Sequence, residues 1–306
     1  MIILRQMIVF FLIMLIGYVL MRKDILDSGT CKRISWIVVN VSNPALIVSG
    51  SFDSGNIRVE DLLQMMLIAL GMYLVLMVLA GILVRVLRIE PEKEASYRML
   101  TIFANVGFMG IPLISAMYGS KALLYGSMFL IPYNVLIYTY GAHLVSGKRR
   151  KTSGMSGKGK EICNIGVISC VMAVLIYVFQ LPLPEYLTNT IQMLSNLTAP
   201  LSMMVIGASL AGLSAKSILE DKKLLLFSML RLLIIPMLGI CLIRLLLRAD
   251  TMLGICLIML AAPAGSMNVM LAQQYDGDVQ TASKGVALTT VLSVVTIPAV
   301  FLFAGL

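Results

Sequence analysis

Two short stretches decide how this chain folds: Phe103-Ala-Asn-Val-Gly-Phe-Met-Gly-Ile-Pro112 and Ala261-Ala-Pro-Ala-Gly-Ser-Met-Asn268. Each lies inside a long apolar run, and each combines proline and glycine with an asparagine. Proline removes a backbone donor and clashes with the preceding turn, and glycine loosens the backbone. In hydrocarbon the freed backbone groups must find partners, so a broken helix survives only inside protein or beside a watery cavity. We therefore predict a broken membrane helix at each stretch.

The composition of the whole chain requires lipid as the solvent. Of 306 residues, 59% are hydrophobic and 13% charged, with a mean hydropathy of +0.95, whereas soluble proteins carry roughly 25% charged residues. This composition excludes an ordinary cytosolic enzyme, a secreted disulfide scaffold and a disordered chain. It predicts an all-α membrane protein with ten transmembrane helices. The apolar runs are 6–21, 34–52, 62–84, 99–118, 122–146, 162–181, 187–213, 224–247, 252–274 and 279–304.

The basic residues indicate the orientation of these helices. A net charge of +9 in a soluble protein would suggest nucleic acid, but here most of the 24 lysines and arginines fall in the odd-numbered loops. Basic loops stay in the cytoplasm, so we predict a multi-pass protein of the cell membrane with both termini outside. The first apolar run lacks a convincing cleavage site and is interpreted as a retained span. The longest loop, 147–161, is predicted to be a flexible cytoplasmic linker.

The two halves of the chain resemble each other. Asn40-Val-Ser-Asn-Pro44 is similar to Asn196-Leu-Thr-Ala-Pro200, and further matches follow in order at nearly the same spacing. We predict two five-helix repeats, 1–146 and 162–306, joined by the linker. Because five is odd, the second repeat must be inverted in the membrane. Inverted repeats are typical of secondary transporters, with the substrate near the midplane.

The chain also resembles a known family. Asn105-Val-Gly-Phe-Met-Gly-Ile-Pro112, the Asn43-Pro44 pair, and Pro263-x-Gly265 followed by Gln274-Tyr275 resemble the auxin efflux carrier family, which includes plant auxin exporters and bacterial transporters of malonate and related carboxylates. The resemblance implies that spans 4 and 9 are crossover helices with substrate at their crossing. It implies a scaffold of spans 1, 2, 6 and 7, a transport part of spans 3–5 and 8–10, and a homodimer through the scaffold.

Three asparagines are the predicted substrate ligands. The family's span-4 asparagine contacts substrate, and it corresponds to Asn105; Asn268 is the candidate in span 9, and Asn43 is the candidate in span 2. The other polar residues of spans 2 and 7 either line a substrate path or join scaffold helices by hydrogen bonds. The predicted crossover helix breaks are Gly107, Pro112, Pro263 and Gly265.

Few charged residues lie inside the spans. Asp61 at the start of span 3 either complements the helix dipole or serves proton coupling. Arg231 and Lys284 lie about two turns from the predicted cytoplasmic ends of spans 8 and 10, where they either snorkel to the headgroups or form a collar around an anion-attracting vestibule. No basic residue is predicted at the midplane. The five cysteines form no C-x-x-C pair and His143 is the only histidine, so neither a metal nor a cofactor is predicted.

These features predict a secondary transporter, not an enzyme, that moves a small organic anion by alternating access. The predicted substrate is a carboxylate, auxin-like or malonate-like, and coupling to protons or sodium stays open. One alternative is a membrane-embedded enzyme acting on a lipid, which needs acidic metal ligands or an acid/base pair at membrane depth. The other alternative is a sensor domain that binds without transporting. No P-loop motif is present in the sequence.

Overall fold

The computed structural model describes residues 2–52, 57–146, 165–212, 221–247 and 249–306, and their regular structure is helical except for one isolated β-bridge. The first half contains α1 (Ile2–Arg22), α2 (Ser28–Ile37), η1 (Val38–Ser42), α3 (Asn43–Ser49), α4 (Val59–Val86), α5 (Glu94–Ile102), η2 (Val106–Gly110), α6 (Ile111–Tyr118), η3 (Ser120–Ala122), α7 (Leu123–Leu136), η4 (Ile137–Gly141) and α8 (Ala142–Ser146). The second half contains α10 (Ile165–Val178), α11 (Glu185–Asn196), α12 (Thr198–Ala211), α14 (Lys222–Met229), η7 (Leu230–Ile234), α15 (Ile235–Ile243), α16 (Asp250–Ala261), α17 (Met267–Gln274) and α18 (Val279–Ala304).

The prediction of an all-helical membrane fold is confirmed. In the described ranges, six helical segments are long and apolar enough to cross a membrane: Ile3–Arg22, Val59–Val86, Ser120–Ser146, Glu185–Ala211, Lys222–Ile243 and Val279–Ala304. Three shorter apolar helices, Val106–Tyr118, Ile165–Val178 and Asp250–Ala261, lie in three of the other four predicted runs. The fourth run, 34–52, is helical through α2, η1 and α3 and is not among the candidate spans. The predicted linker 147–161 lies outside the described residues.

The outer surface of α4 shows why the chain needs lipid. Leu63, Leu67, Leu74 and Val78 are all more than half exposed along this helix. A row of large apolar side chains on the outside of a soluble protein would be an association site. On a membrane helix the same row faces hydrocarbon, so the exposed surface agrees with the sequence prediction.

Proline shapes three helices without ending them. In the described residues, the π-helical turns η1, η2 and η7 each run directly into an α-helix whose second residue is proline: Pro44, Pro112 or Pro236. Proline in a regular helix clashes with the carbonyl one turn earlier, and a π-turn widens the backbone at that point. The chain therefore stays helical through these prolines.

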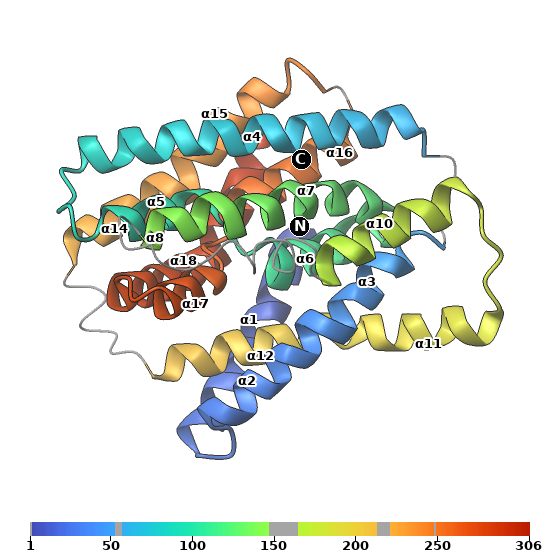
Figure 1. Cartoon of the computed structure of the whole chain (residues 1–306), viewed down its shortest axis with the longest axis horizontal. Helices are drawn as coiled ribbons and strands as arrows, with labels where there is room; N and C mark the ends of the chain where they lie inside the picture. The colour runs from blue at the N-terminus through green and yellow to red at the C-terminus, as the bar shows by residue number, and fades with distance from the viewer. Residues whose placement is uncertain (1, 53–56, 147–164, 213–220, 248) are drawn as a thin grey trace.

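The helices contact one another in a pattern that crosses between the two halves. α1 of the first half packs along α12 of the second, and α10 of the second half packs on α3 of the first. On the other side, α4 contacts α5 and α7, while α15 contacts α16. Figure 1 shows α4 along one edge of the molecule and α11 and α12 along the opposite edge.

Close approach of α1 and α12 depends on two glycines. A Cβ atom added at Gly207 would lie 1.8 Å from the backbone oxygen of Met14, and one added at Gly17 would lie 2.1 Å from the backbone oxygen of Met204. Both obstacles are backbone atoms, so neither can move aside as a side chain can. The contact follows the small-residue rule for packing membrane helices.

We expect Gly207→Ala to separate α1 from α12 and to destabilise the protein by about 3 kcal/mol or more, the upper part of the range for overpacking. The measurement is the melting temperature and the monodisperse yield in detergent. Gly71→Ala on α4 is the matched control, because a Cβ atom there meets nothing within 4 Å. Equal melting temperatures for the two variants would contradict the close packing.

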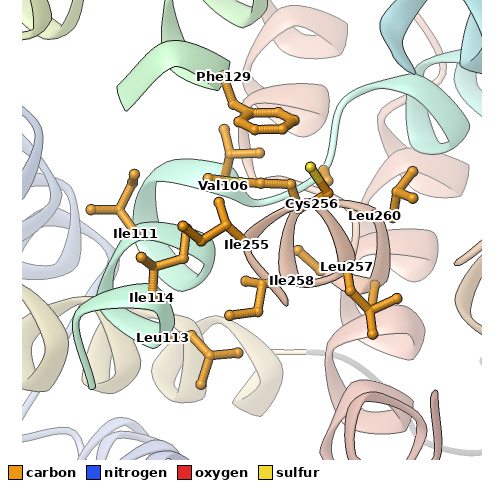
Figure 2. Close-up of a cluster of buried hydrophobic side chains, with 14 of the residues drawn as sticks. Val106, Ile111, Leu113, Ile114, Phe129, Ile255, Cys256, Leu257, Ile258 and Leu260 are labelled. Atoms are coloured by element: carbon orange, nitrogen blue, oxygen red, sulfur yellow. The ribbon is translucent and has the colours of Figure 1, made fainter. Parts of the chain in front are cut away.

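Apolar side chains fill the space where the second part of span 4 meets the first part of span 9. Figure 2 shows Val106, Ile111 and Ile114 of η2 and α6 facing Ile255 and Ile258 of α16. All of these side chains are buried. This apolar packing fixes the position of η2 and α6 relative to α16, and with it the position of the neighbouring helix breaks.

Candidate functional site: the helix crossing

Two interrupted helices meet at their breaks. α5 ends at Ile102 and α16 ends at Ala261, and each is followed by a short non-helical segment. Ala104 and Ala264 form an antiparallel β-bridge between these segments. The Asn105 backbone N–H donates to the Pro263 oxygen at 2.7 Å, and the Gly265 N–H donates to the Phe103 oxygen at 3.0 Å. The backbone groups freed by one break are therefore satisfied by the other.

Pro263 and Gly265, two of the residues predicted to interrupt a helix, lie in the non-helical segment that follows α16. Pro263 supplies an acceptor and has no N–H group that would need a partner. A Cβ atom at Gly265 would lie only 2.9 Å from the backbone oxygen of Ala104. Glycine at this position therefore permits the two backbones to approach closely enough to pair.

The first break lies earlier than the sequence predicts. The non-helical residues are 103–105, whereas Gly107 is in η2 and Pro112 is at the start of α6. The physical reason is that the π-turn accommodates Pro112 inside a continuing helix. The break instead coincides with Asn105, which begins the next helix as its N-cap.

The side-chain oxygen of Asn105 accepts a hydrogen bond, whereas its NH2 group has no acceptor among the described residues. Its Oδ1 atom accepts from the Phe108 N–H at 3.2 Å, and its backbone oxygen accepts from the Met109 and Gly110 N–H groups. The side chain is buried to 5% exposure. Its Nδ2 group donates no hydrogen bond within the described residues. The amide is therefore held by its oxygen and keeps its donor for another partner.

Asn268 lies near the second break but makes its side-chain hydrogen bond to the first break, residues 103–105. Its Nδ2 group donates to the Phe103 oxygen at 3.0 Å, so α17 is tied to the first broken segment. The residue is 1% exposed, and its buried Oδ1 atom has no partner in the described part of the chain. The structure thus brings both crossover asparagines to the same pair of breaks.

Spans 2 and 7 reach the crossing through η2. A Cβ atom at Gly107 would lie 3.6 Å from the Nδ2 atom of Asn43, so this amide lies beside the first turn of η2. From the other side, the Ser202 hydroxyl lies 3.0 Å from the Phe108 oxygen and 2.6 Å from the Thr198 oxygen. At Ser202, therefore, a polar side chain of span 7 contacts a neighbouring helix.

The predicted coupling residue Asp61 and the predicted vestibule residue Lys284 make no hydrogen bond to the described residues of this crossing. Asp61 is in the first turn of α4, and its Oδ1 atom pairs with Arg58 Nη2 at 3.0 Å. The hydrogen bond to that carboxylate raises the pKa of Arg58. Lys284 on α18 is half-buried, and no hydrogen bond or ion pair joins it to another described residue.

Arg231 lies in the protein interior, whereas both of its predicted roles, snorkelling and a vestibule collar, place its charge at a surface. Its side chain is 0% exposed, and its Nη1 group donates to the Leu260 oxygen at 2.6 Å, beside the second break. It neither snorkels outward nor lines an exposed collar. Sequence position gives the depth of a residue along its helix, but it does not show which neighbour the side chain faces.

Sequence reasoning also missed Thr289 on α18. Its buried Oγ1 atom accepts from the Ala264 N–H at 3.1 Å, so it satisfies a donor that the second break leaves free. The only signal in the sequence is the pair Thr289-Thr290 inside an otherwise apolar stretch. A threonine hydroxyl usually bonds within its own helix, so this pattern does not single out a contact to another helix.

Comparison with known proteins supports this description along the whole fold. Residues 2–301 match the profile of the protein family described as "Membrane transport protein". An "Uncharacterized transporter" of Methanothermobacter thermautotrophicus is 24% identical over 290 residues, covering 94% of this chain and 93% of that protein. "Uncharacterized transporter MJ1031" of Methanocaldococcus jannaschii is 23% identical over 296 residues, covering 94% of each. With the long apolar helices, these matches indicate a multi-pass membrane protein.

Proposed function

We propose that this chain, which belongs to the auxin efflux carrier family of membrane transport proteins, is a secondary transporter of a small organic anion. The observation that carries the proposal is the paired break, where the Asn105 amide N–H group has no hydrogen-bond acceptor among the described residues. η2 and α17 both begin at this crossing, and helix N-termini carry partial positive charge. A carboxylate of the auxin or malonate type suits this set of donors.

The proposed architecture is ten spans in two inverted five-helix repeats. Each half of the described chain runs through a first helix, a two-part second span, a third span, an interrupted fourth span and a fifth span. The first helix of each half packs on the second span of the other half, α1 on α12 and α10 on α3. This reciprocal packing supports a pseudo-symmetric scaffold of spans 1, 2, 6 and 7. Spans 3–5 and 8–10 then form the moving part.

In this proposal the substrate lies between the scaffold and the moving part. Asn105 and Asn268 belong to the moving part, whereas Asn43 belongs to the scaffold and lies beside η2. Alternating access requires that the contact between Asn43 and η2 changes as the moving part shifts. Asp61 is the proposed coupling residue, and its pair with Arg58 at the helix start is what protonation would weaken.

A thermal-shift screen of the purified protein tests the proposed substrate class. A ligand at 100 times its Kd stabilises a protein by about 2.7 kcal/mol. We expect malonate, indole-3-acetate or another mono- or dicarboxylate to raise the melting temperature, and the matching neutral amides to have little effect. A panel in which only cations or uncharged compounds stabilise the protein would contradict an anion transporter.

The proposed topology predicts which loops reagents can reach from outside. In a cysteine-free background on intact cells, a cysteine replacing Glu185 should react with an impermeant thiol reagent, and a cysteine replacing Ser153 should react only after permeabilisation. The reason is the basic loop around residue 153, which the positive-inside rule keeps in the cytoplasm. Labelling of the Ser153 position but not the Glu185 position on intact cells would reverse the proposed orientation.

A further inference from the structure

Arg231 is a buried charge beside the helix crossing, and the proposed substrate site does not use it. It lies in the π-helical turn η7 and is the largest fully buried side chain in the described structure. Its surroundings include its own helix, α16, which it contacts through Leu260, and α18, which packs on η7. Tyr73 on α4 also interacts electrostatically with it. A basic side chain in such a place requires a partner, since an unpaired buried charge is very costly.

One of its donors replaces a backbone hydrogen bond that the break removes. In an uninterrupted helix the Leu260 oxygen would accept from the N–H four residues later, at Ala264. That N–H donates instead to Thr289 Oγ1. Arg231 Nη1 takes its place at 2.6 Å, which puts a positive charge at the negative end of α16.

The charge of Arg231 is only partly balanced. Its Nε and Nη2 atoms are buried and have no hydrogen-bond partner among the described residues. None of the ion pairs in the described structure includes it. The end of a helix offers the equivalent of about half a negative charge. The remaining positive charge therefore acts on whatever occupies the neighbouring crossing.

We propose that Arg231 is the residue that makes the crossing select an anion over an uncharged molecule of the same shape. Leu260 is four residues from Ala264, the partner of Ala104 in the bridge, and four residues of chain span at most about 14 Å. With an effective dielectric constant of about 20, a unit charge at that distance changes anion binding by about five- to tenfold. The inference rests on the proposed function and adds the origin of its charge selectivity.

Three substitutions separate the charge of Arg231 from its hydrogen bond. Arg231→Lys keeps the charge and a donor, Arg231→Gln keeps a donor without charge, and Arg231→Met keeps neither. The probes are two matched pairs: malonate with malonamide, and indole-3-acetate with indole-3-acetamide. The quantity measured is the ratio of affinities for the acid and the amide. Arg85→Gln is the control, because it removes the same charge from an exposed position at the end of α4.

We expect the wild type, Arg231→Lys and Arg85→Gln to favour the carboxylates equally, and Arg231→Gln to lose about five- to tenfold of that preference. A purely structural role predicts a different result: Arg231→Gln matches the wild type, and only Arg231→Met is destabilised. An unchanged acid-to-amide ratio in Arg231→Gln overturns the inference and leaves the proposed function standing. A wild type without preference for either acid overturns both.

A second measurement covers the case in which the neutral variants fail to fold. A buried lysine loses its proton far more readily than arginine does, so the preference of Arg231→Lys should fall between pH 7 and pH 9.5 while that of the wild type stays constant. Tyr73 on α4 is the titratable group that interacts electrostatically with Arg231, and Tyr73→Phe in both backgrounds removes its contribution. A preference of Arg231→Lys that is constant with pH, together with wild-type affinity, overturns the inference.

Discussion

Replacing Asn105 with aspartate is expected to weaken carboxylate binding more than a hundredfold while the protein still folds. In the wild type, Asn105 Oδ1 accepts a hydrogen bond from the Phe108 N–H. An oxygen of the new carboxylate can accept the same bond, so the N-cap of η2 is retained. The substitution removes the amide donor, which is worth about 1.5–3 kcal/mol when it bonds a charged group, and adds repulsion between like charges. Asn105→Ala, which lacks the repulsion, should lose about tenfold to a hundredfold.

Affinity for malonate or indole-3-acetate, measured together with the melting temperature, checks this result. Asn189→Asp is the matched control, because Asn189 is exposed on α11 and receives the same chemical change. We expect it to bind as the wild type does. Wild-type affinity in Asn105→Asp would show that the substrate does not contact the Asn105 amide.

Replacing Gly265 with alanine is expected to reduce transport by at least tenfold. The added Cβ atom would lie 2.9 Å from the Ala104 oxygen, and the backbones must separate to make room. Separation lengthens the hydrogen bond from the Gly265 N–H to the Phe103 oxygen and moves Asn105 relative to Asn268. A misplacement of about 1 Å at a binding site can change rates a hundredfold, and overpacking costs about 1–3 kcal/mol of stability.

The control for this variant is Gly81→Ala, since a Cβ atom on that part of α4 meets nothing within 4 Å. Transport in proteoliposomes and the melting temperature should both change in Gly265→Ala and stay near wild type in Gly81→Ala. A Gly265→Ala protein that transports at the wild-type rate would show that the close backbone pairing is not needed for the transport cycle.

The sequence allowed the helix breaks to be predicted because their signals are local, whereas the crossing of spans 4 and 9 was implied by the family resemblance. A proline and a glycine two residues apart, as at Pro263 and Gly265, act on their own backbone and do so in any fold. Asn105 was predicted through a family resemblance, and its N-cap geometry agrees with the general preference of asparagine for that position. Helical character followed from composition, because lipid leaves few other ways to satisfy the backbone.

Other features depend on neighbours that are far apart in the sequence. Whether Pro112 breaks its helix depends on the preceding π-turn, and no residue pattern predicts such a turn. The contacts of Arg231 with Leu260 and of Thr289 with Ala264 join residues that are 29 and 25 positions apart in the sequence. Periodicity places these residues on a helix, but only packing decides which faces meet. For the same reason, the close approach of α1 and α12 at Gly17 and Gly207 was not predicted.

Exchange of a carboxylate across a sealed membrane is the direct test of whether this chain transports organic anions. Proteoliposomes loaded with unlabelled malonate or indole-3-acetate are diluted into trace labelled compound, and uptake against empty liposomes is followed. We predict rapid counterflow of at least one carboxylate by the wild type, none of its neutral amide, and strongly reduced counterflow in Asn105→Asp. Folded, reconstituted wild-type protein that exchanges no mono- or dicarboxylate faster than empty liposomes would contradict the account.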